Sequence, residues 1–186
     1  MRFSENRTVA WIVLAACVLI SIFGLSGFSL AGERDKILDV FYDGTEKGET
    51  SRHSMDAYLD RAGECAQVMA MEAQLHLGSE NAAAVRMLES LGSFGDDDGL
   101  DARYEAYLQL QKDSDVLYNE MYAAGLTDAQ RVNFKTAYDD FWGSDKFIRR
   151  DAYRSLASDF NESLDGFPAS VVAALHGIEE LNSFGG

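Results

Sequence analysis

The sequence predicts an all-α fold, in which an N-terminal transmembrane helix precedes an elongated antiparallel helical bundle. Three observations support this prediction. An uncharged, apolar stretch covers residues 9–30. The rest of the chain places apolar residues three or four positions apart, the spacing of one helical face, and shows no strand-like alternation. The 186 residues contain a single proline, Pro168, and proline interrupts helices.

The apolar stretch follows a short N-terminal tail, residues 1–8. At about 1.5 Å per helical residue, residues 9–30 extend roughly 33 Å, enough to cross a hydrocarbon core of about 30 Å. The apolar region of a cleavable signal is usually only about 7–15 residues long, so the length favours an uncleaved signal-anchor. Two alternatives remain open. Ser29-Leu30-Ala31 resembles a signal cleavage site, and Cys17 follows a small-residue pair typical of lipidation.

Residues 31–49 are interpreted as a juxtamembrane extension and a loop. Ile37, Val40 and Phe41 lie three and four apart, so the membrane helix is expected to continue to about Tyr42. Asp43-Gly44 should end it.

Residues 50–186 are expected to form the bundle. Thr50 or Ser51 is a candidate N-cap for its first helix, and Ser79 is one for the second. Thr127 and Gln130 have capping-box spacing, and Gly143-Ser144 is predicted to break one helix and cap the next. The expected helices run from residue 50 or 51 to 77, 79–92, 100–124, 127–142, 147–164 and 169–181.

The composition is strongly acidic, with 31 Asp and Glu against 16 Lys and Arg and a formal net charge of −15. A domain of this charge repels nucleic acid and anionic headgroups. We therefore predict no nucleic-acid partner. Basic proteins or cations suit the charge, although it also serves solubility alone.

The membrane orientation is less strongly marked. Arg2 and Arg7 precede the apolar stretch, while Arg34, Lys36 and Lys47 follow it closely. A short arginine-containing tail usually stays in the cytoplasm, so we expect an extracytoplasmic C-terminal domain. A cytoplasmic domain, or a domain exported after cleavage near Ala31, is the alternative.

The familiar motifs of catalysis are absent from the sequence, including His-Glu-x-x-His, Cys-x-x-Cys and the phosphate-binding Gly-x-x-x-x-Gly-Lys loop. Glu72 and His76 lie one helical turn apart but are too few for a structural zinc site. Residues 96–98 and Asp101 form an acidic loop whose spacing fails the EF-hand pattern. Glu64 should raise the pKa of the neighbouring Cys65 thiol and make it a poor nucleophile. We predict no catalytic, cofactor or metal site, and no enzyme.

The C-terminal thirty residues carry a recognisable pattern. A tyrosine is followed seven residues later by an aromatic-Asn pair, then by Phe-Pro and an apolar Ala-x-x-Gly segment that ends in an aromatic. The chain resembles the LemA family in this pattern, as a divergent member whose N-terminal half matches loosely. The positions that carry the resemblance are Tyr153, Phe160, Asn161, Leu164, Phe167, Pro168, Val172, Ala173, Gly177 and Phe184.

The resemblance implies a single-anchor membrane protein with an elongated antiparallel helical domain and no agreed activity. From spacing alone, Tyr153, Phe160 and Phe167 lie seven apart and should share one helical seam. Ala173 and Gly177, four apart, should allow close backbone approach. We predict a non-enzymatic scaffold or adaptor in the cell envelope, with the bilayer at residues 9–30 and a membrane or envelope protein as partners. A carboxylate-based ligand or metal-binding module is the alternative, and the oligomeric state stays open.

Overall fold

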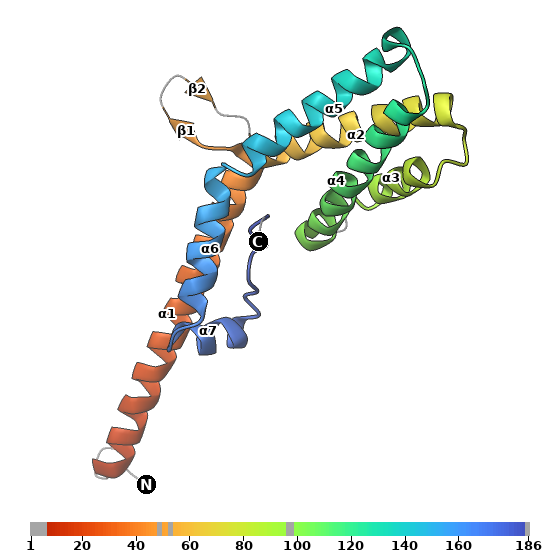
Figure 1. Cartoon of the computed structure of the whole chain (residues 1–186). Coiled ribbons are helices and arrows are strands. Elements are labelled where there is room, and N and C mark those ends of the chain that lie inside the picture. Colours follow the sequence, from red (N-terminus) through yellow and green to blue (C-terminus); the bar gives the residue numbers. More distant parts are fainter. Residues whose placement is uncertain (1–6, 48–49, 52–53, 96–98, 185–186) are drawn as a thin grey trace. The chain divides into compact units, whose positions relative to one another are not determined.

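The computed structural model describes residues 7–47, 50–51, 54–95 and 99–184 (Figure 1). Helices make up almost all of this part of the chain, which confirms the all-α prediction. Two two-residue strands form one antiparallel pair, Glu46 with Ser51 and Lys47 with Thr50. The elements in order are α1 (Arg7–Asp43), β1 (Glu46–Lys47), β2 (Thr50–Ser51), α2 (Met55–Leu77), α3 (Ala82–Gly92), α4 (Gly99–Ala123), α5 (Asp128–Ile148), α6 (Ala152–Leu164) and α7 (Ala169–His176).

These elements belong to two compact units. The first unit consists of Met1–Asp39 and Leu156–Leu181, as far as these ranges are described. The second consists, with the same restriction, of Val40–Ser155 and Asn182–Gly186. The predicted single bundle of residues 50–186 is thus shared between the two units.

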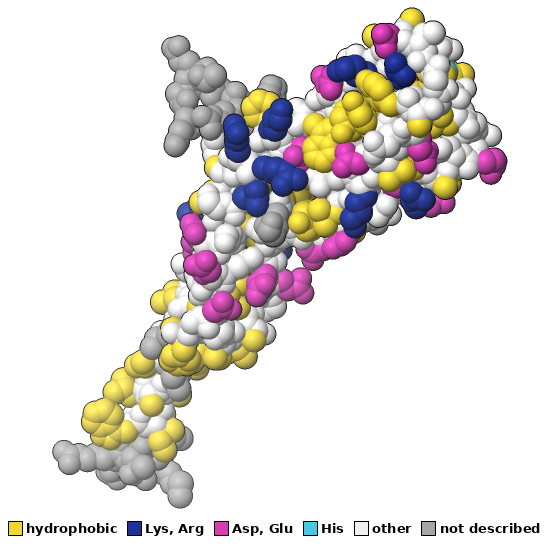
Figure 2. Space-filling model, viewed as in Figure 1, with side chains coloured by type: hydrophobic (Ala, Val, Ile, Leu, Met, Phe, Trp, Pro, Cys, Tyr) yellow, Lys and Arg dark blue, Asp and Glu magenta, His cyan; other side chains and the backbone are white. Residues whose placement is uncertain are grey.

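Helix α1 is long and apolar enough to cross a membrane, as judged by its length and composition. Its apolar half leaves large side chains uncovered, including Trp11 at 68%, Ile20 at 72% and Leu25 at 72% exposure. Figure 2 shows hydrophobic side chains gathered over the N-terminal part of α1. The helix ends at Asp43, and Gly44 follows with a φ of +79°, as predicted. The helix therefore has the features of a single-pass anchor or a signal sequence.

Helices α2, α3, α4 and α5 form an up-down-up-down bundle within the second unit. Contacts of Arg61 with Asp140 and of Asn133 with Glu72 set α2 and α5 antiparallel. The antiparallel pairing of α3 and α4 follows in the same way from the contacts of Asn81, the N-cap of α3, with Glu120 and of Arg86, near the middle of α3, with Asp113. The core of the bundle is apolar and tightly covered, with Leu59, Met69, Met87, Leu110, Leu117, Phe134 and Phe141 fully buried.

Two predicted helix starts in this bundle are wrong by a few residues. Helix α2 begins at Met55 because Ser54, not Thr50 or Ser51, caps it by accepting a hydrogen bond from the Ala57 N–H at 3.1 Å. Helix α3 is capped by Asn81 rather than Ser79, since the Asn81 side chain accepts from two backbone N–H groups. The capping box of Thr127 and Gln130 at the start of α5 is confirmed.

The predicted break at Gly143-Ser144 is also wrong, because α5 continues to Ile148. Ser144 and Asp145 are buried there, at 6% and 4% exposure. The hydrogen bonds of Asp145 with Tyr107 and Gln111 offset the cost of a helical glycine, about 1 kcal/mol relative to alanine. Helix α6 consequently starts at Ala152 rather than residue 147.

Helix α4 buries charged residues that the sequence pattern did not identify. Its covered face repeats at three or four residues and includes Arg103 at 2% exposure and Asp113 at 1%. The Arg103 Nη1 donates to Asp56 Oδ1 and its Nη2 donates to Asp60 Oδ1, both at 2.6 Å. The guanidinium carbon also lies 5.9 Å from the Phe41 ring centroid and 5.4 Å from that of Phe94. Arg103 thus ties α4 to α2 inside the second unit.

Candidate functional site

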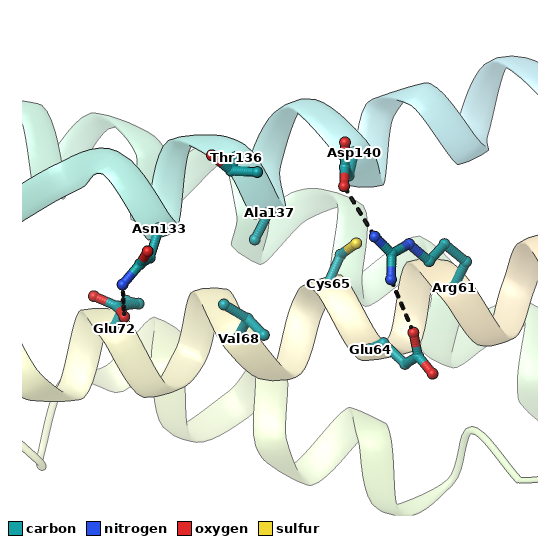
Figure 3. Close-up of a pocket in the computed structure, with 9 residues that line it drawn as sticks. All are labelled: Arg61, Glu64, Cys65, Val68, Glu72, Asn133, Thr136, Ala137 and Asp140. Carbon is teal, nitrogen blue, oxygen red and sulfur yellow. Dashed lines mark hydrogen bonds and ion pairs between the residues drawn. The ribbon is translucent and has the colours of Figure 1, made fainter.

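A groove between α2 and α5 is the first candidate for a site, and Figure 3 shows its lining. Its volume is about 420 Å³, and both helices supply side chains to it. The antiparallel pairing of the two helices brings together positions that are 61 to 79 residues apart in sequence. The lining residues are Arg61, Glu64, Cys65, Val68, Glu72, Asn133, Thr136, Ala137 and Asp140.

The charged groups of this groove are engaged with one another. Arg61 contacts Glu64 at 3.1 Å and Asp140 at 3.0 Å, and Asn133 donates to Glu72 Oε1 at 3.0 Å. Glu72 also lies 3.6 Å from His76 Nε2, so the predicted proximity of these two residues is confirmed. Three carboxylates and one guanidinium leave the lining acidic. Such a lining suits a basic polypeptide or another cation better than an anion.

Cys65 is the lone thiol in the groove lining. Burial raises the pKa of this thiol more than any other effect; Asp140 and Glu64 raise it further, while Arg61 opposes them. The predicted direction is therefore right, but Glu64 is the smallest of these causes. A protonated thiol at neutral pH is a poor nucleophile.

We expect Cys65 to react with a maleimide at pH 7 about tenfold more slowly in the folded chain than in urea, because the side chain is buried and the thiolate is scarce. The measurement is a labelling time course by mass spectrometry on a Cys17→Ser variant, which leaves one thiol. Equal rates in the two conditions would show that the groove is open to reagents.

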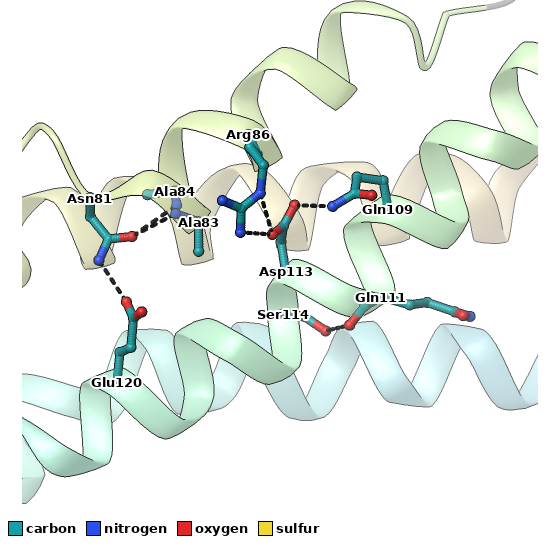
Figure 4. A network of polar contacts seen from close by, with 9 residues as sticks. All are labelled: Asn81, Ala83, Ala84, Arg86, Gln109, Gln111, Asp113, Ser114 and Glu120. Atoms are coloured by element: carbon teal, nitrogen blue, oxygen red, sulfur yellow. Dashed lines mark hydrogen bonds and ion pairs between the residues drawn. The ribbon is translucent and has the colours of Figure 1, made fainter.

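A second polar cluster joins α3 to α4 (Figure 4). Asp113 accepts from Arg86 Nε at 3.0 Å and Nη2 at 2.6 Å, and from Gln109 at 2.8 Å. At the start of α3, the N-cap Asn81 donates to Glu120 at 2.6 Å while it caps its own helix. Every polar group in this cluster has a partner from the chain itself, so the cluster serves packing.

A third cluster centres on the buried carboxylate of Asp145. It accepts hydrogen bonds from the Tyr107 hydroxyl and from Gln111, both at 2.7 Å, and from Arg149 at 2.6 Å. Burial raises the pKa of Tyr107 well above its ordinary value, and the hydrogen bond to Asp145 raises it further. Tyr138 behaves similarly, with burial and Asp115 raising its pKa to about 12.

The raised pKa of Tyr107 predicts a loss of stability at alkaline pH. Above pH about 10 the unfolded chain releases this proton while the folded chain keeps it, so the free energy of unfolding falls as pH rises, by about 1.4 kcal/mol per pH unit for this group. Tyr107→Phe should remove that part of the slope. Urea unfolding between pH 9 and 11, followed by circular dichroism, tests this. Parallel slopes for the two proteins would contradict it.

The other acidic residues considered as ligand or metal sites do not come together at one place. Asp139 pairs with Lys135 on α5 whereas Asp140 faces Arg61, so the two adjacent acids have separate partners. Glu179 and Glu180 are both exposed. The acidic loop of residues 96–98 lies outside the described part of the chain. Among the described residues, no group of three or more His, Cys, Asp or Glu side chains is placed to hold a metal ion.

The residues that carry the C-terminal pattern have mixed positions. Tyr153 is buried, and its hydroxyl donates to the Asn182 carbonyl at 2.8 Å. Phe160 is buried too, and Asn161 both donates to and accepts from the Leu181 backbone, at 2.8 Å each. Apart from the motif, nothing in the sequence predicted these two hydrogen bonds between the Asn161 side chain and the Leu181 backbone.

Two expectations about this pattern are wrong. Phe167 does not share a helical seam with Tyr153 and Phe160, because α6 ends at Leu164 and Phe167 is 83% exposed in the following turn. Pro168 comes next and caps α7. Gly177 makes no close approach. Instead its φ of +65° ends α7 after eight residues, at His176 rather than at the predicted residue 181, and its N–H donates to the Ala173 carbonyl.

Comparison with known proteins adds no assignment, since no family model, curated protein or solved structure matches the chain.

Proposed function

We propose that this chain is a membrane-anchored, non-enzymatic helical-bundle adaptor of the LemA type in the cell envelope, which binds a partner protein through the α2–α5 groove. The observation that carries the proposal is α1. Its large apolar side chains are exposed along many helical turns, and soluble proteins rarely leave so large an apolar surface in contact with water. A bilayer covers such a surface at no cost.

The groove supports a binding role over a catalytic one. Its carboxylates are paired with Arg61 or Asn133, and its thiol is protonated at neutral pH. Neither a nucleophile activated by a base nor an unpaired acid occurs in this lining. The C-terminal pattern adds the resemblance to LemA proteins, for which no catalytic residue is carried over.

Photo-crosslinking in native membranes tests the adaptor role. We would place a benzoylphenylalanine at Val68, which lines the groove and is 42% exposed, and at Val116 on α4, which is 39% exposed, as the control. A discrete heavier product from position 68 and none from position 116 is expected. Monomer at both positions would argue against an adaptor.

Anchoring and orientation need separate measurements. Resistance of the chain to alkaline carbonate extraction, at its full mass, is expected if α1 stays in the bilayer; a shortened and extractable product would indicate signal cleavage.

For orientation, a Val132→Cys variant in the Cys17→Ser, Cys65→Ser background places an exposed thiol on α5. Labelling of this thiol by an impermeant reagent in intact cells is expected for an extracytoplasmic domain.

A further inference from the structure

Helix α7 and the turn before it present an apolar row that no part of their own unit covers. Phe167, Val171 and Leu175 are spaced by four residues and are 83%, 41% and 68% exposed. The opposite side of the helix packs inward, with Val172 at 0% and Ala173 at 6% exposure. The helix contains no Asp, Glu, Lys or Arg. An open apolar face of this kind marks a surface that interacts with a membrane or with another molecule.

The position of α7 along α1 is fixed by a contact within the first unit. A Cβ atom added to Gly27 would lie 2.4 Å from His176 Nε2, so the imidazole occupies the space that any other residue at position 27 would need. Figure 1 shows α7 lying crosswise to α1 at this level. The C-terminal end of α7 therefore abuts the apolar stretch itself.

The rise per residue along α1 gives the depth at which α7 meets the bilayer. The residues from Val9 to Gly27 rise about 27 Å along a helix, close to the thickness of a hydrocarbon core of about 30 Å. The next charged residue after Gly27 is Glu33, about 9 Å further along. When residues 9–27 cross the core, α7 falls at the boundary between acyl chains and headgroups.

We propose that α7 is a second membrane contact, an in-plane helix that inserts Phe167, Val171 and Leu175 among the lipid acyl chains beside the anchor. The proposal rests on the proposed membrane anchoring. In Figure 2 hydrophobic side chains cover the apolar part of α1 and are also present in the region of α7, so lipid around the anchor can reach this helix. Asp165, Glu179 and Glu180 are exposed on either side of the row, so the favoured lipid is zwitterionic rather than anionic.

Depth-dependent quenching in vesicles tests this contact on the full chain. In a Cys17→Ser, Cys65→Ser background, an environment-sensitive fluorophore would be attached at Leu175→Cys. Matched labels would be placed at Val132→Cys on α5, 54% exposed, and at Val18→Cys on α1, 49% exposed. Phosphatidylcholine vesicles without a spin label, with one high on the acyl chain, or with one near the chain end supply the probe, because position 175 is expected near the headgroups and position 18 near the bilayer centre. Quenching about threefold stronger at position 175 than at position 132 is expected.

The three labels separate the possible failures. Quenching at position 18 with no excess at 175 over 132 would overturn the α7 contact and leave the anchor standing. Quenching at neither 18 nor 175 would overturn the anchor as well. Adding Phe167→Ser and Val171→Ser should halve the quenching at 175 while circular dichroism stays unchanged. Stronger quenching in vesicles that contain phosphatidylserine would overturn the assignment to zwitterionic lipid.

Discussion

Replacing Arg103 with methionine is expected to lower the free energy of unfolding by about 3 kcal/mol, because it removes two hydrogen bonds between charged groups, each worth about 1.5 kcal/mol. Methionine keeps an aliphatic stem against the Phe41 and Phe94 rings but removes the cation that holds Asp56 and Asp60. Arg103→Lys should be intermediate, because an ammonium cannot reproduce the two-pronged guanidinium geometry. Urea unfolding in detergent, followed by circular dichroism, measures each loss.

The same chain contains a matched control. Arg61 also joins two carboxylates, Glu64 and Asp140, but its side chain is 55% exposed. Exposed pairs contribute about 0–1 kcal/mol, so Arg61→Met should cost less than about 1 kcal/mol. If the Arg61 and Arg103 variants lost equal stability, burial would not be what gives Arg103 its importance.

Replacing Arg86 with leucine should cost about 2 kcal/mol, because it leaves the carboxylate of Asp113 buried without its cation. The estimate is lower than for Arg103 since Arg86 is itself 48% exposed and partly screened by water. Gln109 remains as a hydrogen-bond donor to Asp113 and limits the loss further.

A double-mutant cycle tests that explanation. Arg86→Leu combined with Asp113→Leu removes both charges, so the double variant should be more stable than the Arg86→Leu variant alone. Additive losses from the two substitutions would mean that the pair does not act as a unit. Asn81→Ala serves as a control on the same helix, with the loss of about 1 kcal/mol expected for an N-cap.

The features that sequence predicted well are those set by neighbouring residues. The capping box of Thr127 and Gln130 needs only residues three apart, and the stops at Gly44 and Gly78 need only local backbone geometry. The apolar stretch of α1 is similarly evident from composition. The core positions Leu110, Leu117 and Met121 on α4 also follow the apolar spacing of one helical face.

The features that sequence missed depend on residues far away in the chain. Arg103 and Asp113 have the composition of a solvated face, and their burial follows only once α2 and α3 supply opposite charges. Gly143-Ser144 looks like a helix end, but Asp145 holds the helix through Tyr107 and Gln111 on α4. The candidate groove was invisible for the same reason, because it requires the pairing of α2 with α5.

Phe184 packs against aromatic rings that are synthesised well before it, so these rings stay uncovered until the C-terminus has been made. Its ring is 3% exposed and lies 5.5 Å from the Phe41 ring and 5.2 Å from that of Tyr104. The Tyr153 hydroxyl bonds to Asn182, 29 residues further along. At about 5–20 residues per second, translation leaves these aromatic rings without their cover for roughly 1.5–6 s after Tyr153 is added. A nascent chain stalled in that interval would present a sticky aromatic surface to chaperones, which the finished protein conceals.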